Sequence, residues 1–283
     1  MFLMDTLPRV LVFVFVVASM LGIGMQTGAA DLRVLQASKG ALLRSLLANF
    51  VVVPALGFVM SRTLPLDPDV ACALLLLACT PGGMSALQFT GKMKGASLFA
   101  GSNTFILSFL AVFISPALLE ILHPAHVPVV MRAGPALFSV VAFLLLPLGL
   151  GTLVRGKASR LADKVSAPCA LIGAIAFIVA TLLIMGERKE AMNAVGKEGI
   201  LAMLALILSS MAAGWLMGGP ARETRPVLAT VTGMRNVALC LLVGLETFPG
   251  PAVQTPLVAF SALMVPPNML LTAFILIRKR KVR

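Results

Sequence analysis

Long apolar runs recur along the chain and are separated by short segments that carry most of its charged residues. A transmembrane helix needs about 20 consecutive, mainly apolar residues to cross the hydrocarbon core of a bilayer. By this measure the pattern predicts nine spans, at about 10–27, 42–61, 70–90, 97–119, 133–153, 166–186, 199–219, 227–245 and 255–277. We therefore predict an all-α integral membrane protein that forms one transmembrane domain over residues 1–283.

Two of these spans contain sequences that do not suit a regular helix. The third ends in Thr80-Pro81-Gly82-Gly83, and the eighth carries Gly233 between threonines and an asparagine. Proline removes a backbone donor, and glycine leaves the backbone free to adopt other conformations. Irregular backbone at membrane depth is tolerated only where protein buries it or where it lines a cavity. Each break is therefore either a kink or a binding site.

The eighth span also contains a charge, Arg235, in the middle of an apolar run. A charged side chain at the bilayer centre costs roughly 3 kcal/mol on insertion scales. The predicted spans contain no acidic residue, and Glu246 follows eleven residues later, about 16 Å along a helix. We expect Arg235 to bind unwound carbonyls, the C-terminal end of a half-helix, or a bound anion.

Composition supports a membrane protein and excludes several soluble classes. The chain is 59% hydrophobic and 12% charged, with a mean hydropathy of +1.01. Its net charge of +12 does not indicate nucleic-acid binding, because Lys and Arg collect in short loops and in the C-terminal tail. Their distribution predicts an outside N-terminus and a cytoplasmic C-terminus. We expect a multi-pass protein of a plasma membrane, here a bacterial inner membrane.

Candidate catalytic and metal-binding groups are sparse. The cysteines lie in apolar runs without histidines in the same segments, at Cys72, Cys79, Cys169 and Cys240. Both histidines, His123 and His126, lie in one predicted outer loop. We therefore expect no metal site, no cofactor and no enzymatic activity.

A short internal repeat links the two breaks. Gly83-Met84-Ser85-Ala86-Leu87 in the third span matches Gly233-Met234-Arg235-Asn236-Val237 in the eighth, and a span with polar residues follows each. With four spans between them, the two segments cross the membrane in opposite directions, as an inverted repeat requires. Two inverted repeats of five helices each would give nine spans if the first helix were missing.

The motifs Pro81-Gly82-Gly83 and Gly233-Met234-Arg235-Asn236, together with Met20-Leu21-Gly22-Ile23-Gly24-Met25, resemble the bile acid:sodium symporter family. The resemblance covers nearly the whole chain. It implies a panel domain at about 10–27 and 133–186 and a core domain at about 42–119 and 199–277. It also implies that two discontinuous helices cross near the midplane, with substrate and sodium bound around the crossing.

The sequence departs from the family at the sodium ligands. Thr104 matches a sodium-binding threonine, but Ala100 replaces a serine, Val231 a glutamate and Arg235 a glutamine. A site without its carboxylate and with a guanidinium in its wall is expected to bind sodium poorly. The resemblance therefore leaves sodium coupling open. The weakened ion site would comprise Ser85, Thr104, Val231, Met234 and Arg235.

These observations predict a secondary transporter that moves a small organic anion by alternating access. Three roles remain open for Arg235: a built-in cation that replaces sodium, a direct ligand of the anion, and a structural arginine that reaches an interface. Cys79 suggests an exporter of oxyanions such as arsenite as one alternative, and a membrane ligand sensor is another. The oligomeric state is not indicated. The substrate residues would be Ser85, Thr230, Thr232, Arg235, Asn236 and Asn268.

Overall fold

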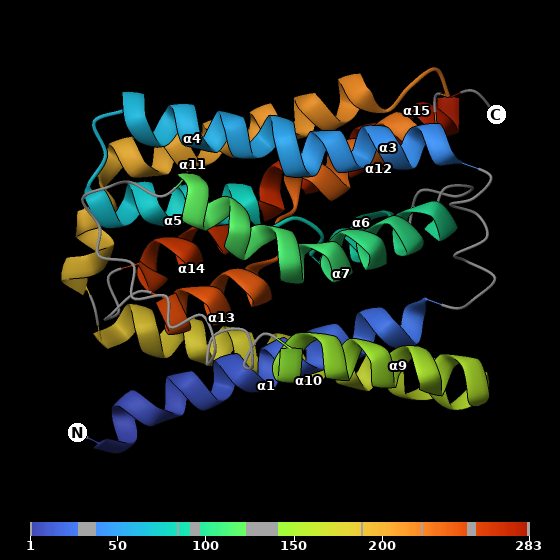
Figure 1. Ribbon diagram of the computed structural model, residues 1–283, viewed down its shortest axis with the longest axis horizontal. Coiled ribbons are helices and arrows are strands. Elements are labelled where there is room, and N and C mark those ends of the chain that lie inside the picture. The colour runs from blue at the N-terminus through green and yellow to red at the C-terminus, as the bar shows by residue number, and fades with distance from the viewer. Residues whose placement is uncertain are drawn as a thin grey trace.

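A computed structural model describes residues 2–27, 38–83, 85–90, 97–122, 141–187, 189–221, 223–247 and 253–281. These ranges are helical apart from short connections, with no strand among them (Figure 1). The elements are α1 (Phe2–Gln26), α3 (Lys39–Leu47), η1 (Ala48–Val52), α4 (Val53–Thr63), α5 (Pro68–Cys79), α6 (Ser85–Thr90), α7 (Ser97–Leu122), η2 (Val141–Leu145), α9 (Leu146–Lys157), α10 (Ser159–Glu187), α11 (Lys189–Met217), α12 (Thr224–Gly233), α13 (Val237–Thr247), α14 (Gln254–Leu263) and α15 (Val265–Lys281).

Seven helical stretches are long and apolar enough to cross a membrane, which supports a multi-pass membrane protein. They are Leu7–Gln26, Lys39–Thr63, Phe99–Leu122, Ser159–Leu183, Val195–Met217, Thr224–Gly244 and Gln254–Ile277. Of the two other predicted spans, 70–90 is divided into two short helices, and 133–153 lies partly outside the described residues. The count of nine spans therefore stays a prediction.

Two π-helical turns adapt the helices to proline. The turn η1 leads into α4, whose second residue is Pro54, and η2 leads into α9, whose second residue is Pro147. Proline lacks an N–H, and its ring collides with the carbonyl four residues earlier. A wider π turn accommodates that carbonyl without ending the helix. The second span is thus continuous through Pro54, and its π turn contains Asn49.

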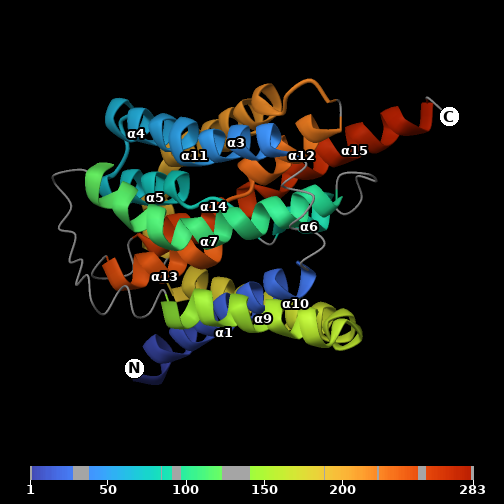
Figure 2. The same ribbon diagram turned by 45° about the vertical axis from the view of Figure 1, so that its right-hand side comes forward.

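The helices α1, α9 and α10 pack on one another and form a layer that stays together in both views (Figures 1 and 2). Gly24 of α1 lies against α9 so closely that a Cβ atom would stand 3.0 Å from the Cα of Gly151. Small residues allow such close contact between membrane helices. The division into a panel and a core stays a prediction, because packing does not show which helices move together.

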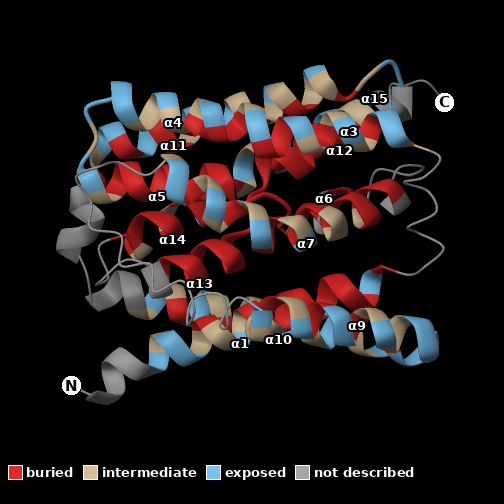
Figure 3. Ribbon diagram, in the orientation of Figure 1, coloured by how far each residue is buried: buried red, intermediate tan, exposed pale blue. Residues whose placement is uncertain are grey.

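Burial is greatest in the middle of the molecule, along α5, α12 and α13 (Figure 3). The most apolar window of Thr224–Gly244 is entirely buried, whereas only 17% of the corresponding window in α10 is buried. In the second half of α10 the exposed residues include large apolar ones such as Leu171, Ile172 and Ile175. Such a surface suits contact with lipid, and the interior holds the polar residues. The two broken helices therefore lie in the protein interior.

Candidate functional site

The two helix breaks meet and hydrogen-bond to each other. The first break is Thr80–Gly83 between α5 and α6, and the second is Met234–Asn236 between α12 and α13. The backbone N–H of Asn236 donates to the Thr80 carbonyl at 3.0 Å. At Gly83 a Cβ atom would stand 2.5 Å from the carbonyl oxygen of Arg235. We call these two breaks together the crossing.

Hydroxyl groups of α7 bind the carbonyls that the first break leaves without a helical partner. Ser108 Oγ donates to the Gly82 carbonyl at 2.6 Å, and Ser115 Oγ donates to the Cys79 carbonyl at 2.6 Å. Gly82 has a φ of +84°, which side chains rarely tolerate. Unwound backbone inside a membrane protein needs such partners, because no water is available to supply them. The polar residues of α7 therefore stabilise the crossing.

Arg235 is 1% exposed and binds the ends of both interrupted helices. Its Nε donates to the Leu77 carbonyl at 2.8 Å, and its Nη2 donates to the Ala78 carbonyl, both in the last turn of α5. Its Nη1 donates to the Thr232 carbonyl at 3.2 Å, at the end of α12. The C-terminal end of a helix carries partial negative charge, which a guanidinium offsets. Of the three kinds of partner expected for Arg235, the C-terminal end of a half-helix is present.

Asn49 completes the surroundings of Arg235, and sequence reasoning missed it. Its Oδ1 accepts from Arg235 Nη1 at 3.0 Å, while its Nδ2 donates to the Ser45 carbonyl at 3.0 Å and to Thr232 Oγ1 at 3.1 Å. The π turn η1 supplies this residue, and π turns are frequent at functional sites. The available signal was a lone amide in an otherwise apolar stretch just before Pro54.

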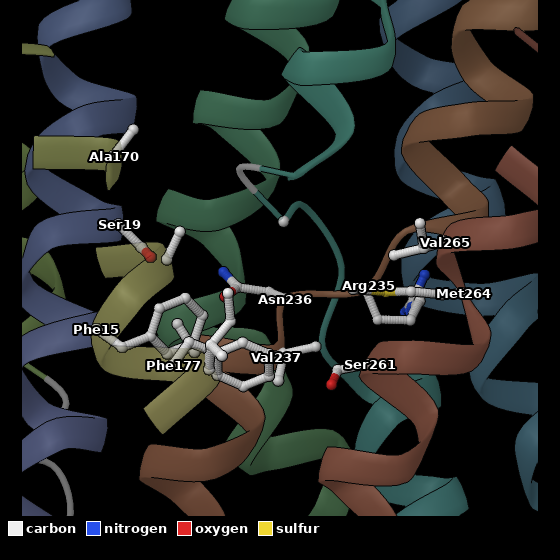
Figure 4. A pocket seen from close by; sticks show the side chains of 14 residues that line it. Phe15, Ser19, Ala170, Phe177, Arg235, Asn236, Val237, Ser261, Met264 and Val265 are labelled. Carbon is white, nitrogen blue, oxygen red and sulfur yellow. The ribbon is translucent and has the colours of Figure 1, made fainter. Parts of the chain in front are cut away.

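Asn236 follows Arg235 in the chain, but the two side chains point in opposite directions (Figure 4). Asn236 Oδ1 accepts from the N–H of Leu239 at 3.0 Å and so caps the N-terminus of α13. Its Nδ2 is buried and has no hydrogen-bond partner. The side chain extends toward Ser19 of α1, whose Oγ is likewise buried and without a partner.

These groups border a cavity of about 210 Å³ between the crossing and the helices α1 and α10 (Figure 4). Its wall is mainly apolar, and the start of α13 contributes Val237 and Ala238. A mostly apolar cavity with a few polar groups is the usual form of a small-molecule site. Among the described residues, no Asp or Glu is buried. Side chains that characterise the wall are Phe15, Ser19, Phe177, Asn236, Ser261 and Met264.

The predicted site residues fall into separate groups. Arg235 and Asn236 border the cavity, whereas Thr232 binds Asn49 behind it. Two hydroxyls, Thr104 Oγ1 in α7 and Thr230 Oγ1 in α12, are buried without a partner and do not border the cavity.

The remaining residues predicted for the substrate and ion sites lie close to the second break or outside the described residues. Val231 and Met234 are buried apolar residues of that segment. Asn268 of α15 donates to the Met264 carbonyl at 2.8 Å, while its Oδ1 lacks a partner and faces Gly233. The Ser85 side chain and both histidines lie outside the described residues. The ion-site assignment therefore stays a prediction.

Comparison with known proteins gives several transporters. The chain is 27% identical over 240 residues to "Probable sodium/metabolite cotransporter BASS2, chloroplastic" of Oryza sativa subsp. japonica, covering 84% of this chain and 57% of the relative. It is 22% identical to "Uncharacterized sodium-dependent transporter YocS" of Bacillus subtilis (strain 168), covering 80% and 71%. It is 29% identical to "Sodium/bile acid cotransporter 4" of Homo sapiens, covering 74% and 49%.

The chain thus spans about half to three quarters of the length of these relatives. Their names describe transporters and not enzymes. The model of the Sodium Bile acid symporter family matches residues 12–194, which is more than half of the sequence. The motif resemblance, the broken helices and this match agree, and the chain belongs to the Sodium Bile acid symporter family.

Proposed function

We propose that the protein is a secondary transporter that carries a small organic anion across the membrane by alternating access. The cavity beside the crossing is the observation that carries this proposal. There Asn236 Nδ2 and Ser19 Oγ are buried without partners. A buried polar group without a hydrogen bond is costly, so such groups in a cavity indicate a bound ligand. The transporter names of the relatives support the same class of function.

The charge distribution around the cavity favours an anion. The N-terminal residues Val237 and Ala238 of α13 border it, and the N-terminus of a helix carries partial positive charge. The buried guanidinium of Arg235 adds a full positive charge nearby, and no lining residue is acidic. Asn236 Nδ2 and Ser19 Oγ can both donate hydrogen bonds to a carboxylate. The modest volume restricts the cargo to a small molecule.

The position of the cavity suggests how the cargo would move. One wall consists of α1 and α10, and the other consists of the crossing with α14 and α15. In transporters with discontinuous helices, rocking of one bundle against the other exposes a central site to each side in turn. We propose this motion for a panel of residues 10–27 and 133–186 against a core of residues 42–119 and 199–277. We also propose that the C-terminus is cytoplasmic and that the protein lies in a bacterial inner membrane.

Counterflow in proteoliposomes tests the proposal. Vesicles loaded with unlabelled lactate, succinate or citrate are expected to accumulate the same labelled anion, with saturation. Asn236→Asp is the informative variant, because an aspartate keeps the cap on α13 while it loses the Nδ2 donors and adds a negative charge. We expect at least a tenfold loss of exchange with little change in thermal stability. Ser61→Ala, which removes a hydroxyl bound within α4, is the control and should exchange normally.

Two outcomes would contradict the proposal. Exchange at the wild-type rate by Asn236→Asp would show that the cargo does not use this cavity. Saturable binding of an anion without exchange would instead support a membrane ligand sensor. Cys79, on which the alternative of an oxyanion exporter rests, is fully buried and does not border the cavity.

A further inference from the structure

We propose that the guanidinium of Arg235 is a resident cation in the position of a transported or coupling sodium ion, so that this chain works without sodium. The inference rests on the proposed transport function. It concerns the end of the Arg235 side chain that points away from Asn236 (Figure 4). There Asn49 and the ends of α5 and α12 accept its hydrogen bonds. The names of the relatives include sodium, and this chain would differ from them in that respect.

The acceptors around Arg235 form the kind of site that binds a hard cation. Three are backbone carbonyls at the ends of interrupted helices, and the fourth is an amide oxygen; they belong to Leu77, Ala78, Thr232 and Asn49. Unwound carbonyls and half-helix C-terminal ends coordinate sodium in transporters of this general design. Hard cations take carbonyl, amide and carboxylate oxygens as ligands. The oxygens therefore suit sodium, but a covalently attached charge already binds them.

Sodium cannot be added beside Arg235 at low cost. The guanidinium is 1% exposed and uses Nε, Nη1 and Nη2 in these hydrogen bonds. A guanidinium keeps its charge in proteins, so a second cation at the same oxygens would be repelled. No buried Asp or Glu among the described residues offsets two positive charges. Val231, where the resemblance implies a sodium-binding glutamate, is an apolar residue with no exposed surface. The residues present do not fit sodium.

A fixed cation also removes the structural need for a mobile one. The partial negative ends of α5 and α12 both bind the Arg235 guanidinium at the crossing, and a positive charge at this place offsets them. In a sodium-coupled protein, the bound ion would supply that charge and link its gradient to the cargo. Here Arg235 supplies it permanently. Transport would then follow the gradient of the anion itself or exchange one anion for another.

The first test compares sodium with other cations in the wild-type protein. Thermal unfolding of the detergent-solubilised chain is measured in sodium chloride, potassium chloride and choline chloride at equal ionic strength. Counterflow is measured in the same salts. We expect equal melting temperatures and equal exchange rates. A melting temperature several degrees higher in sodium, or exchange at least threefold faster in sodium, would overturn the inference.

The second test empties the cation position. Arg235→Ala leaves the four oxygens without their cation, and its melting temperature should fall in choline and recover partly in sodium. Arg155→Ala is the control, because Arg155 forms an exposed ion pair with Asp163. The melting temperature of this variant should be the same in sodium and in choline. If Arg235→Ala folds and sodium does not stabilise it, the oxygens are not a cation site and the inference is wrong. If it does not fold, Arg235→Lys, which keeps a charge, is measured instead and should remain indifferent to sodium.

The readouts separate this inference from the proposed function. Melting temperatures that do not respond to sodium, together with no exchange of any anion, would contradict the transport proposal and leave the role of Arg235 intact. Exchange that sodium stimulates would support the transport proposal and contradict the role proposed for Arg235.

Discussion

Asn49 and Arg235 are 186 residues apart in sequence, yet Asn49 Oδ1 accepts a hydrogen bond from Arg235 Nη1 at 3.0 Å. Through Nδ2, the same amide binds Thr232 Oγ1 at the end of α12. A π turn in the second span is thereby connected to the break in the eighth span. This contact gives the buried guanidinium its only described side-chain acceptor, the others being backbone carbonyls. Asn49 should therefore matter as much as the residues that border the cavity.

Substitution Asn49→Ala should destabilise the protein. Arg235 Nη1 would lose an acceptor, and a hydrogen bond to a charged group contributes about 2 kcal/mol. We expect a clear fall in the melting temperature of the detergent-solubilised protein and slower counterflow. Ser61→Ala, which removes a hydroxyl that donates to the Phe58 carbonyl within its own helix, should cost much less. Equal effects of the two substitutions would argue against a special role for Asn49.

Replacement of Gly83 by alanine should separate the two breaks. The new Cβ would lie 2.5 Å from the carbonyl oxygen and 3.1 Å from the carbonyl carbon of Arg235, and this backbone cannot easily move aside. We expect loss of counterflow and a cost of about 2 kcal/mol from overpacking. Gly101→Ala in α7 is the matched control, since no atom beyond its neighbours and the adjoining helix backbone lies within 4 Å of the added Cβ. That control should be neutral or stabilising, because alanine favours helix.

The hydroxyl of Ser108 should stabilise the first break. Ser108→Ala leaves the Gly82 carbonyl without its α7 donor, and we expect a cost of about 1 kcal/mol in thermal unfolding. Ser209→Ala removes a hydroxyl that only bonds within its own helix, at 3.1 Å to the Leu206 carbonyl, and should have a smaller effect. An unchanged melting temperature for Ser108→Ala would show that the break is held by other contacts.

Thiol reactivity should distinguish the cysteines. Cys72, Cys79 and Cys240 are buried, whereas Cys169 of α10 is partly exposed. A buried thiol reacts slowly, so N-ethylmaleimide should modify Cys169 first in the folded protein. Mass spectrometry of peptides would locate the label, and counterflow should persist after it. Rapid labelling of Cys79 with loss of activity would favour the oxyanion exporter.

Local chemistry explains why much of the architecture could be predicted. Long apolar runs cannot be covered by the few charged residues, so membrane insertion follows from composition and pattern. Pro81, Gly82 and Gly83 end α5 for reasons that lie within a few residues, and α12 likewise ends at Gly233. The cost of burying Arg235 identified a special site before any partner was known.

The tertiary structure alone decided the direction and partners of these side chains. Arg235 and Asn236 are adjacent in sequence, yet the Arg235 side chain binds the ends of α5 and α12, while the Asn236 side chain points the opposite way, toward Ser19. The partners of Asn49 and Ser19 could not be predicted, because each depends on a helix that packing brings close. The sequence by itself determined that the chain is a membrane protein with two broken helices, since apolar length and backbone freedom are local properties. Hydrogen bonds between distant segments depend on how whole helices pack, and this packing decided which side chains of the broken helices border the cavity and which contacts hold the crossing together.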